Sequence, residues 1–251
     1  MKKPGIVLGV LGFAWLGGSC QSEMALLLRS QIASTLTQAP LAYPPFLVDE
    51  ATADFYRQRG LEYRDRDNFE RAIAALKTSV ALDPYNANGY VVLGWTEHLA
   101  GQETAAAQTL QQALQQEPEN VPALNALGIV YLVSGDLQAA VSTHSRAAEL
   151  KPDNEIAYYN LSLAYQRLQN ADAAIENARK ATELEPYNPH PWVALAIAHW
   201  SNQAPDAAQQ AYQQAIALDG RYRDRSFLDH LIQAGFNPTQ VDLSAEVLAY
   251  R

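Results

Sequence analysis

A 34-residue period runs through most of this 251-residue chain and limits the folds that it can adopt. Four columns of residues keep the period through five units without an insertion. The columns are Gly60, Gly94, Gly128, Ser162 and Ala196; Ala72, Ala106, Ala140, Ala174 and Ala208; Ser79, Ala113, Ala147, Ala181 and Ala215; and Pro84, Pro118, Pro152 and Pro186, with Gly220 in the fifth place. A fixed period of this length is the signature of repeat architectures, in which each unit packs mainly against its neighbours.

The residue types in these columns predict two helices in each unit. Small residues in the first two columns let the paired helices approach closely, and the third column lets the second helix pack against the next unit. Each proline follows a helix end, where it prevents the helix from continuing. Gly101 and Gly135 fall between the paired helices, where glycine readily adopts the left-handed conformation of a tight turn.

The repeat resembles the tetratricopeptide repeat, whose order of residues is W-x2-L-G-x2-Y…A-x3-F…P. The third unit matches this order best, through Leu124, Leu127, Gly128, Tyr131, Gly135, Ala140, Ala147 and Pro152. Glu97 and His199 stand in place of the tyrosine in two other units. The resemblance implies an all-α, right-handed superhelical solenoid of five helix-turn-helix units with a C-terminal capping helix. The units are residues 53–86, 87–120, 121–154, 155–188 and 189–222.

Residues 223–251 are too few for a catalytic domain, and we expect them to cap the array. A helical stripe there would cover the apolar side of the last repeat, as the end of a solenoid requires. Its residues are Phe227, Leu228, Leu231 and Ile232. A second short helix is indicated by Leu243, Val247 and Leu248.

The first twenty residues have the features of a bacterial export signal. Lys2 and Lys3 precede an uncharged, largely apolar run over residues 6–18, which is shorter than the about 20 residues of a membrane span. The segment that ends at Cys20 resembles a lipobox, which implies cleavage and lipidation of that cysteine. Ordinary cleavage before Cys20 and retention of the segment as an anchor are the alternatives. We therefore expect export to the periplasmic side of an envelope membrane, where Cys20 would carry any lipid anchor.

Residues 21–50 are predicted to be an amphipathic tether followed by a proline-rich linker. Apolar residues recur at helical spacing along 21–38, at Met24, Leu28, Ile32 and Leu36. The prolines at positions 40, 44 and 45 then favour extended backbone. The tether is expected to pack on the repeat domain rather than to bind a membrane surface, because it has one cation, Arg29.

No residue pattern in the chain points to catalysis, a cofactor or a metal. A glycine-rich phosphate loop is missing, and no histidine pair has the spacing that zinc sites favour. The single cysteine excludes internal disulfides. Because 27 Asp and Glu outnumber 18 Lys and Arg, the chain is also a poor match for nucleic acid. The sequence predicts a non-enzymatic protein that needs no cofactor.

The resemblance also implies which residues line the concave face, namely those at repeat positions 2, 5, 9 and 12. We expect a groove that binds an apolar peptide segment there, with Trp95, Tyr159 and Trp200 as its energetic centre. The predicted groove residues are Arg57, Leu61, Arg64, Asn88, Val91, Trp95, His98, Asn125, Ile129, Leu132, Tyr159, Leu163, Gln166, Val193, Ile197 and Trp200. The alternative is that these aromatic side chains pack internally, or that residues 21–38 cover them.

Together these features predict a scaffold or assembly factor that binds a partner polypeptide, is exported, and is tethered to a membrane if Cys20 is lipidated. One alternative is a permanent subunit of an envelope complex, similar to those that assemble the outer membrane or a pilus secretin. Another is a cytoplasmic binding module with an anchor, which would hold if the signal is not processed.

Overall fold

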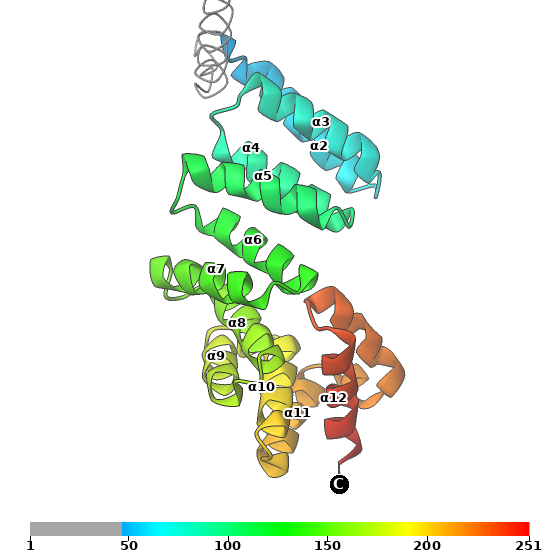
Figure 1. Cartoon of the computed structure of the whole chain (residues 1–251). Coiled ribbons are helices and arrows are strands. Elements are labelled where there is room, and N and C mark those ends of the chain that lie inside the picture. The colour runs from blue at the N-terminus through cyan, green and yellow to red at the C-terminus, as the bar shows by residue number, and fades with distance from the viewer. Residues whose placement is uncertain (1–46, 251) are drawn as a thin grey trace, which may run out of the picture. The chain divides into compact units, whose positions relative to one another are not determined.

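The computed structural model of the chain describes residues 47–250, and this part of the chain is helical without a strand. Five helix pairs stack one after another, as Figure 1 shows from top to bottom. The pairs are α2 (Glu50–Arg64) with α3 (Phe69–Leu82), α4 (Ala87–Leu99) with α5 (Glu103–Gln116), α6 (Val121–Ser134) with α7 (Leu137–Leu150), α8 (Glu155–Arg167) with α9 (Ala171–Leu184), and α10 (Pro189–Ser201) with α11 (Pro205–Leu218). The predicted all-α solenoid of five helix-turn-helix repeats is confirmed.

A column of asparagines, again 34 residues apart, begins the first helix of four repeats. Each side-chain oxygen accepts a hydrogen bond from a backbone N–H in the first turn of the helix that follows. The four residues are Asn86, Asn120, Asn154 and Asn188. An N-cap of this kind contributes about 1 kcal/mol, because it satisfies a backbone donor that the helix leaves free. The column therefore fixes where each repeat begins.

The glycine column lets the two helices of a repeat make close contact. A Cβ atom on Gly60 or Gly94 would lie 2.6 Å from the Cγ atom of Leu76 or Leu110, respectively. In the third repeat, a Cβ atom on Gly128 would lie 2.5 Å from a ring nitrogen of His144. These separations are too short for carbon, so glycine is required at the three positions.

His144 is the polar residue among these three contacts, and it is fully buried. Neither ring nitrogen has a hydrogen-bond partner within residues 47–250. Burial lowers the pKa of His144 to about 4, although the adjacent backbone of Gly128 opposes part of this shift. The ring is therefore neutral at physiological pH, and its burial carries an energetic cost.

Glu97, which replaces the consensus tyrosine in the second repeat, is also buried. Its carboxylate accepts a hydrogen bond of 2.7 Å from the Thr109 hydroxyl and lies 3.6 Å from the Lys77 ammonium of the preceding repeat. The substitution thus replaces an aromatic contact by a polar link between two repeats. A buried carboxylate needs such partners to offset its lost hydration.

The chain after the fifth repeat folds back along the array. It consists of η2 (Gly220–Arg223), η3 (Arg225–Ala234) and α12 (Pro238–Ala249). We call residues 225–250, which contain η3 and α12, the C-terminal segment; Figure 1 shows it beside α10. The predicted cap would cover only the last repeat, but this segment reaches α8 as well. The Tyr159 hydroxyl donates to the carbonyl of Ala234 at 2.5 Å, and the Gln240 amide donates to the carbonyl of Leu163 at 3.1 Å.

Several predicted features fall outside the described residues. These are the signal over residues 1–20, the lipidation site Cys20, the tether over 21–38 and most of the linker. Within residues 47–250, no helix has both the length and the apolar character that crossing a membrane requires.

Candidate partner-binding groove

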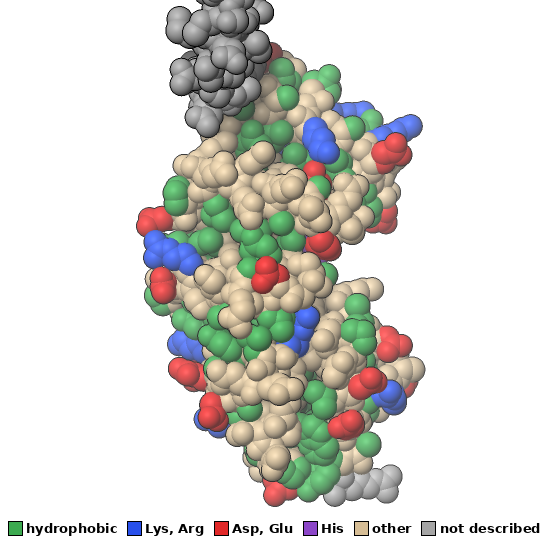
Figure 2. All heavy atoms as spheres, viewed as in Figure 1, with side chains coloured by type: hydrophobic (Ala, Val, Ile, Leu, Met, Phe, Trp, Pro, Cys, Tyr) green, Lys and Arg blue, Asp and Glu red, His purple; other side chains and the backbone are tan. Residues whose placement is uncertain are grey.

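A cavity of about 990 Å³ opens between the second repeat and the C-terminal segment, and we call it the central groove. The surface is hollowed between these parts in Figure 2. The ends of α4 and α6, the beginnings of α8 and α10, and the end of η3 contribute its lining. The lining residues are Trp95, His98, Leu99, Ile129, Val133, Glu155, Ile156, Tyr159, Asn160, Glu185, Asn188, Pro191, Ile232, Gln233, Ala234 and Gly235.

Aliphatic side chains give the central groove its character. Four of them are exposed to between 40% and 48%, namely Leu99, Val133, Ile156 and Ile232. Residues 47–250 hold nine large apolar side chains with marked exposure, so nearly half of them gather in this one cavity. Contiguous exposed apolar surface of this kind marks an interaction site, whereas scattered apolar residues do not.

Trp95 offers the central groove an aromatic ring and a free donor. The indole nitrogens of Trp192 and Trp200 donate to Pro186 and Glu246, at 3.1 and 2.9 Å. The indole N–H of Trp95 makes no such bond within residues 47–250. Its ring lies 5.0 Å from that of His98, whose Nδ1 atom is 2.8 Å from a carboxylate oxygen of Glu103. Trp95 is thus available to a ligand both as a surface and as a donor.

Carboxylates supply the formal charge of the lining, which contains Glu155 and Glu185 but neither lysine nor arginine. Glu185 follows α9, and one of its oxygens accepts a 2.8 Å hydrogen bond from the Asn188 amide. Glu155 is the first residue of α8, and its side chain has no hydrogen-bond or ion-pair partner within residues 47–250. The central groove is therefore apolar, with negative charge where α8 and α10 begin.

The structure brings four of the sixteen predicted groove residues into this cavity: Trp95, His98, Ile129 and Tyr159. Four others are fully buried, and for these the expected open surface is wrong. They are Leu132, Leu163, Val193 and Ile197. The physical reason is the C-terminal segment, whose Leu231, Phe236 and Val241 belong to the same buried cluster.

Two further predicted residues are engaged by the same segment. Trp200 donates to Glu246 and its ring contacts that of Tyr250 at 5.5 Å between centroids. Gln166 accepts a 2.9 Å hydrogen bond from Gln240. Of the three aromatic residues expected to dominate binding, Trp95 alone lines the cavity without a bond to the C-terminal segment. The alternative that the aromatic side chains are covered internally is therefore seen for Trp200 and partly for Tyr159, and residues 225–250 provide the cover.

The other six predicted residues lie outside the central groove. They are Arg57, Leu61, Arg64, Asn88, Val91 and Asn125. Arg57 pairs with Asp54 at 2.7 Å, and Arg64 lies 3.4 Å from Asp65. Asn125 exchanges hydrogen bonds of 2.9 and 3.2 Å with the capping residue Asn154. Because its amide is already paired, Asn125 stabilises the junction of two repeats.

Sequence reasoning missed several lining residues. Leu99 and Val133 are 34 residues apart at the ends of their helices, so the repeat pattern could have identified them together. Glu155 and Glu185 stand beside the proline and asparagine columns that end and begin repeats. Ile232 and its neighbours through Gly235 had no such signal, because they lie in the non-repeating part of the chain.

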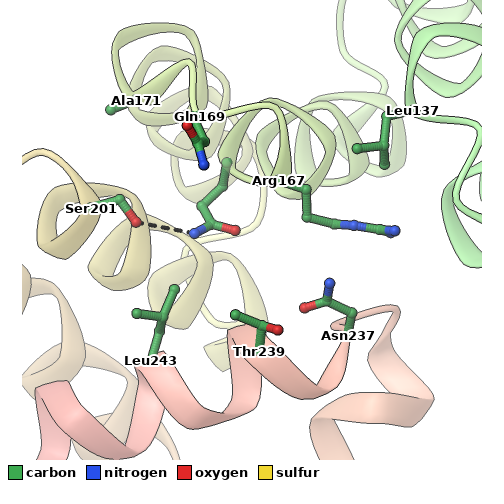
Figure 3. A pocket seen from close by; sticks show the side chains of 9 residues that line it. Leu137, Arg167, Gln169, Ala171, Ser201, Asn237, Thr239 and Leu243 are labelled. Carbon is green, nitrogen blue, oxygen red and sulfur yellow. Dashed lines mark hydrogen bonds between the residues drawn. The ribbon is translucent and has the colours of Figure 1, made fainter.

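A smaller cavity of about 560 Å³ lies where α8 meets α12, and Figure 3 shows its side chains. The Gln166 amide donates to the Ser201 hydroxyl at 3.0 Å, and the Arg167 guanidinium donates to the carbonyl of Leu132 at 2.5 Å. Gln166 and Arg167 thus link α8 to α10 and to α6, and these two polar groups of the cavity already have partners. No cluster of three or more potential metal ligands occurs within the described part of the chain.

Family models described as tetratricopeptide repeat match four stretches of the sequence. The matched residues are 57–121, 97–165, 156–188 and 189–222, which together span all five repeats. No curated protein is similar enough to count as a match.

Solved structures share this fold. A MamA protein is 25% identical, with a TM-score of 0.60 over 68% of this chain and 93% of that one. PilF of Pseudomonas aeruginosa is 22% identical, with a TM-score of 0.63 over 78% of this chain and 89% of that one. MamA from Desulfovibrio magneticus RS-1 is 21% identical, with a TM-score of 0.62 over 67% and 95%.

Proposed function

Because this chain is a tetratricopeptide repeat protein, we propose that it is a non-enzymatic scaffold that binds a partner polypeptide in the central groove. The observation that carries the proposal is the gathering of four exposed aliphatic side chains around Trp95. Repeat solenoids commonly use such inner surfaces for binding.

The energetics favour an apolar segment as the ligand. Covering the exposed half of each aliphatic side chain contributes about 1 kcal/mol. Trp95 adds the kind of contact that dominates protein interfaces, because a large aromatic ring in a desolvated pocket often contributes 2 kcal/mol or more. The C-terminal segment provides a model for this recognition, since it already covers the neighbouring inner surface with apolar side chains and a few directed hydrogen bonds.

Trp95→Ala should lower the affinity for the partner by a factor of about 30, which corresponds to the loss of about 2 kcal/mol. Most partner capture from cells that express the full chain should then be lost. Phe55→Ala is the matched control, because Phe55 is an exposed aromatic residue outside the central groove. Capture is measured quantitatively after crosslinking, and the helical content of each variant is checked by circular dichroism. If Trp95→Ala and wild-type protein retain the same partners in the same amounts, the central groove is not the binding site.

We further propose that the protein is exported and held at an envelope membrane through Cys20. The basic start, the short apolar run and the lone cysteine at its end support this proposal. Mass spectrometry of the mature N-terminus tests it. The proposal predicts a chain that begins at a lipid-modified Cys20. A chain that begins at an unmodified Cys20 would support export and contradict the lipid anchor. An intact Met1 would show that the signal is not processed.

A further inference from the structure

We infer that the segment bound in the central groove is both apolar and positively charged, with Lys or Arg side chains that pair with Glu155 and Glu185. This inference rests on the proposed function and names the chemistry of the partner. Three features of the groove support it. They are the charge of the lining residues, the lack of cationic partners for the two carboxylates within residues 47–250, and the position of the apolar surface relative to these carboxylates.

The charge of the lining is one-sided, since its sixteen residues include two carboxylates and no lysine or arginine. A ligand that covers the apolar surface also removes water from these carboxylates. A neutral or acidic segment would leave that lost hydration uncompensated, which opposes binding. A lysine or arginine side chain would offset the loss by a charge-assisted hydrogen bond.

Neither carboxylate pairs with a cation within residues 47–250. Glu155 has no partner within residues 47–250, and Glu185 accepts one hydrogen bond, from the neutral Asn188 amide. Other half-buried or buried carboxylates nearby do have partners: Glu97 is bonded to Thr109, and Glu103 to His98. Glu155 also lies in the first turn of α8, where a negative charge stabilises a helix. The experiment below separates that role from ligand binding.

The position of the apolar surface indicates how the ligand is arranged. Trp95 and Leu99 come from α4, and Val133 comes from the end of α6. The carboxylate of Glu155 comes from the start of α8, and that of Glu185 comes from the turn between α9 and α10. Ile156 is adjacent to Glu155 and joins the two regions. We therefore expect apolar ligand residues against α4 and α6 and a cationic residue toward α8.

The test uses the full chain and three labelled synthetic peptides that share one apolar core of Leu and Phe. Their flanking residues are Lys, Ser or Glu. Fluorescence anisotropy should show that the Lys peptide binds at least about tenfold more tightly than the Ser peptide, and the Glu peptide more weakly still. Raising the NaCl concentration should weaken the Lys peptide selectively, because salt screens charge pairs at a partly exposed site.

The double variant Glu155→Gln/Glu185→Gln should weaken the Lys peptide by about tenfold or more and leave the Ser peptide unchanged. Glu70→Gln/Glu176→Gln is the matched control. It removes the same charge from exposed positions outside the groove, and Glu70 is likewise a first-turn residue, in α3. If Glu155 only stabilises its helix, both double variants will lower thermal stability and neither will change binding.

The outcomes distinguish this inference from the proposed function. Unchanged Lys-peptide affinity in Glu155→Gln/Glu185→Gln would overturn the inference. If all three peptides bind alike and Trp95→Ala weakens all of them, the groove is a binding site and the charge preference is wrong. If no peptide binds, or if Trp95→Ala affects none of them, the inference and the proposed function both fail.

Discussion

Deleting residues 225–251 is expected to unfold the last two repeats at room temperature, or to lower their free energy of unfolding by about 6 kcal/mol or more. Four fully buried side chains of the repeats belong to the same buried cluster as the C-terminal segment and would lose its cover, and full burial of such a side chain contributes about 1.5–3 kcal/mol. They are Leu132, Leu163, Val193 and Ile197. The loss is comparable to the whole stability of an ordinary domain.

Urea unfolding followed by circular dichroism measures this loss, and binding of a hydrophobic dye reports the exposed surface. Ile232→Ala is the control within the same segment. Its side chain is nearly half exposed at the central groove, so the substitution should change stability by about 0.5 kcal/mol or less. An unchanged urea midpoint and no dye binding after deletion would show that the C-terminal segment does not hold the repeats together.

Replacing His144 by leucine is expected to stabilise the protein and to remove part of its acid sensitivity. Unfolded histidine has a pKa near 6.5, whereas burial lowers the pKa of His144 to about 4. Between these values the unfolded state binds a proton that the folded state excludes. The contribution of His144 to stability is therefore constant above pH 6.5 and falls as the pH drops toward 4, by about 3 kcal/mol in all.

The repeat supplies its own controls for this prediction. Leu76 and Leu110 occupy the same column and contact the equivalent glycines, so the space accommodates leucine. Leu110→His should create the same acid sensitivity in the second repeat. The free energy of unfolding is measured in urea from pH 4 to 7, and the difference between wild type and His144→Leu cancels other titrating groups. Parallel pH profiles for the two proteins would contradict the assignment.

The fold could be derived from the sequence because its contacts repeat. Gly60 and Leu76 meet within one repeat, and the same pair recurs 34 residues later as Gly94 and Leu110. Each such contact is local, so periodic columns record it directly. The capping asparagines recur with the same period, because each one begins the equivalent helix of its repeat.

The site could be predicted only in part because its walls do not repeat. The hydrogen bond from Tyr159 to Ala234 joins residues that are 75 positions apart, and no periodic pattern in the sequence predicts it. Gly235, with a φ of +89°, ends η3 and turns the chain back toward α8, so that Phe236 becomes buried. The C-terminal segment therefore covers several of the consensus inward positions and forms one wall of the groove that remains open. His144 was also unforeseen as a buried base, because the consensus residue there is aromatic and apolar.

Site-specific photocrosslinking in living cells tests the central claim most directly. A photoreactive phenylalanine analogue is introduced at Val133 or Ile156 in the central groove, at Trp200 under the C-terminal segment, or at the exposed Gln108 of α5. The account predicts a discrete adduct with a second polypeptide at Val133 and Ile156 that Trp95→Ala abolishes. It predicts an internal crosslink to residues 242–250 at Trp200, and no adduct at Gln108. Adducts of equal yield at Gln108 and Val133, or partner adducts at Trp200 alone, would contradict it.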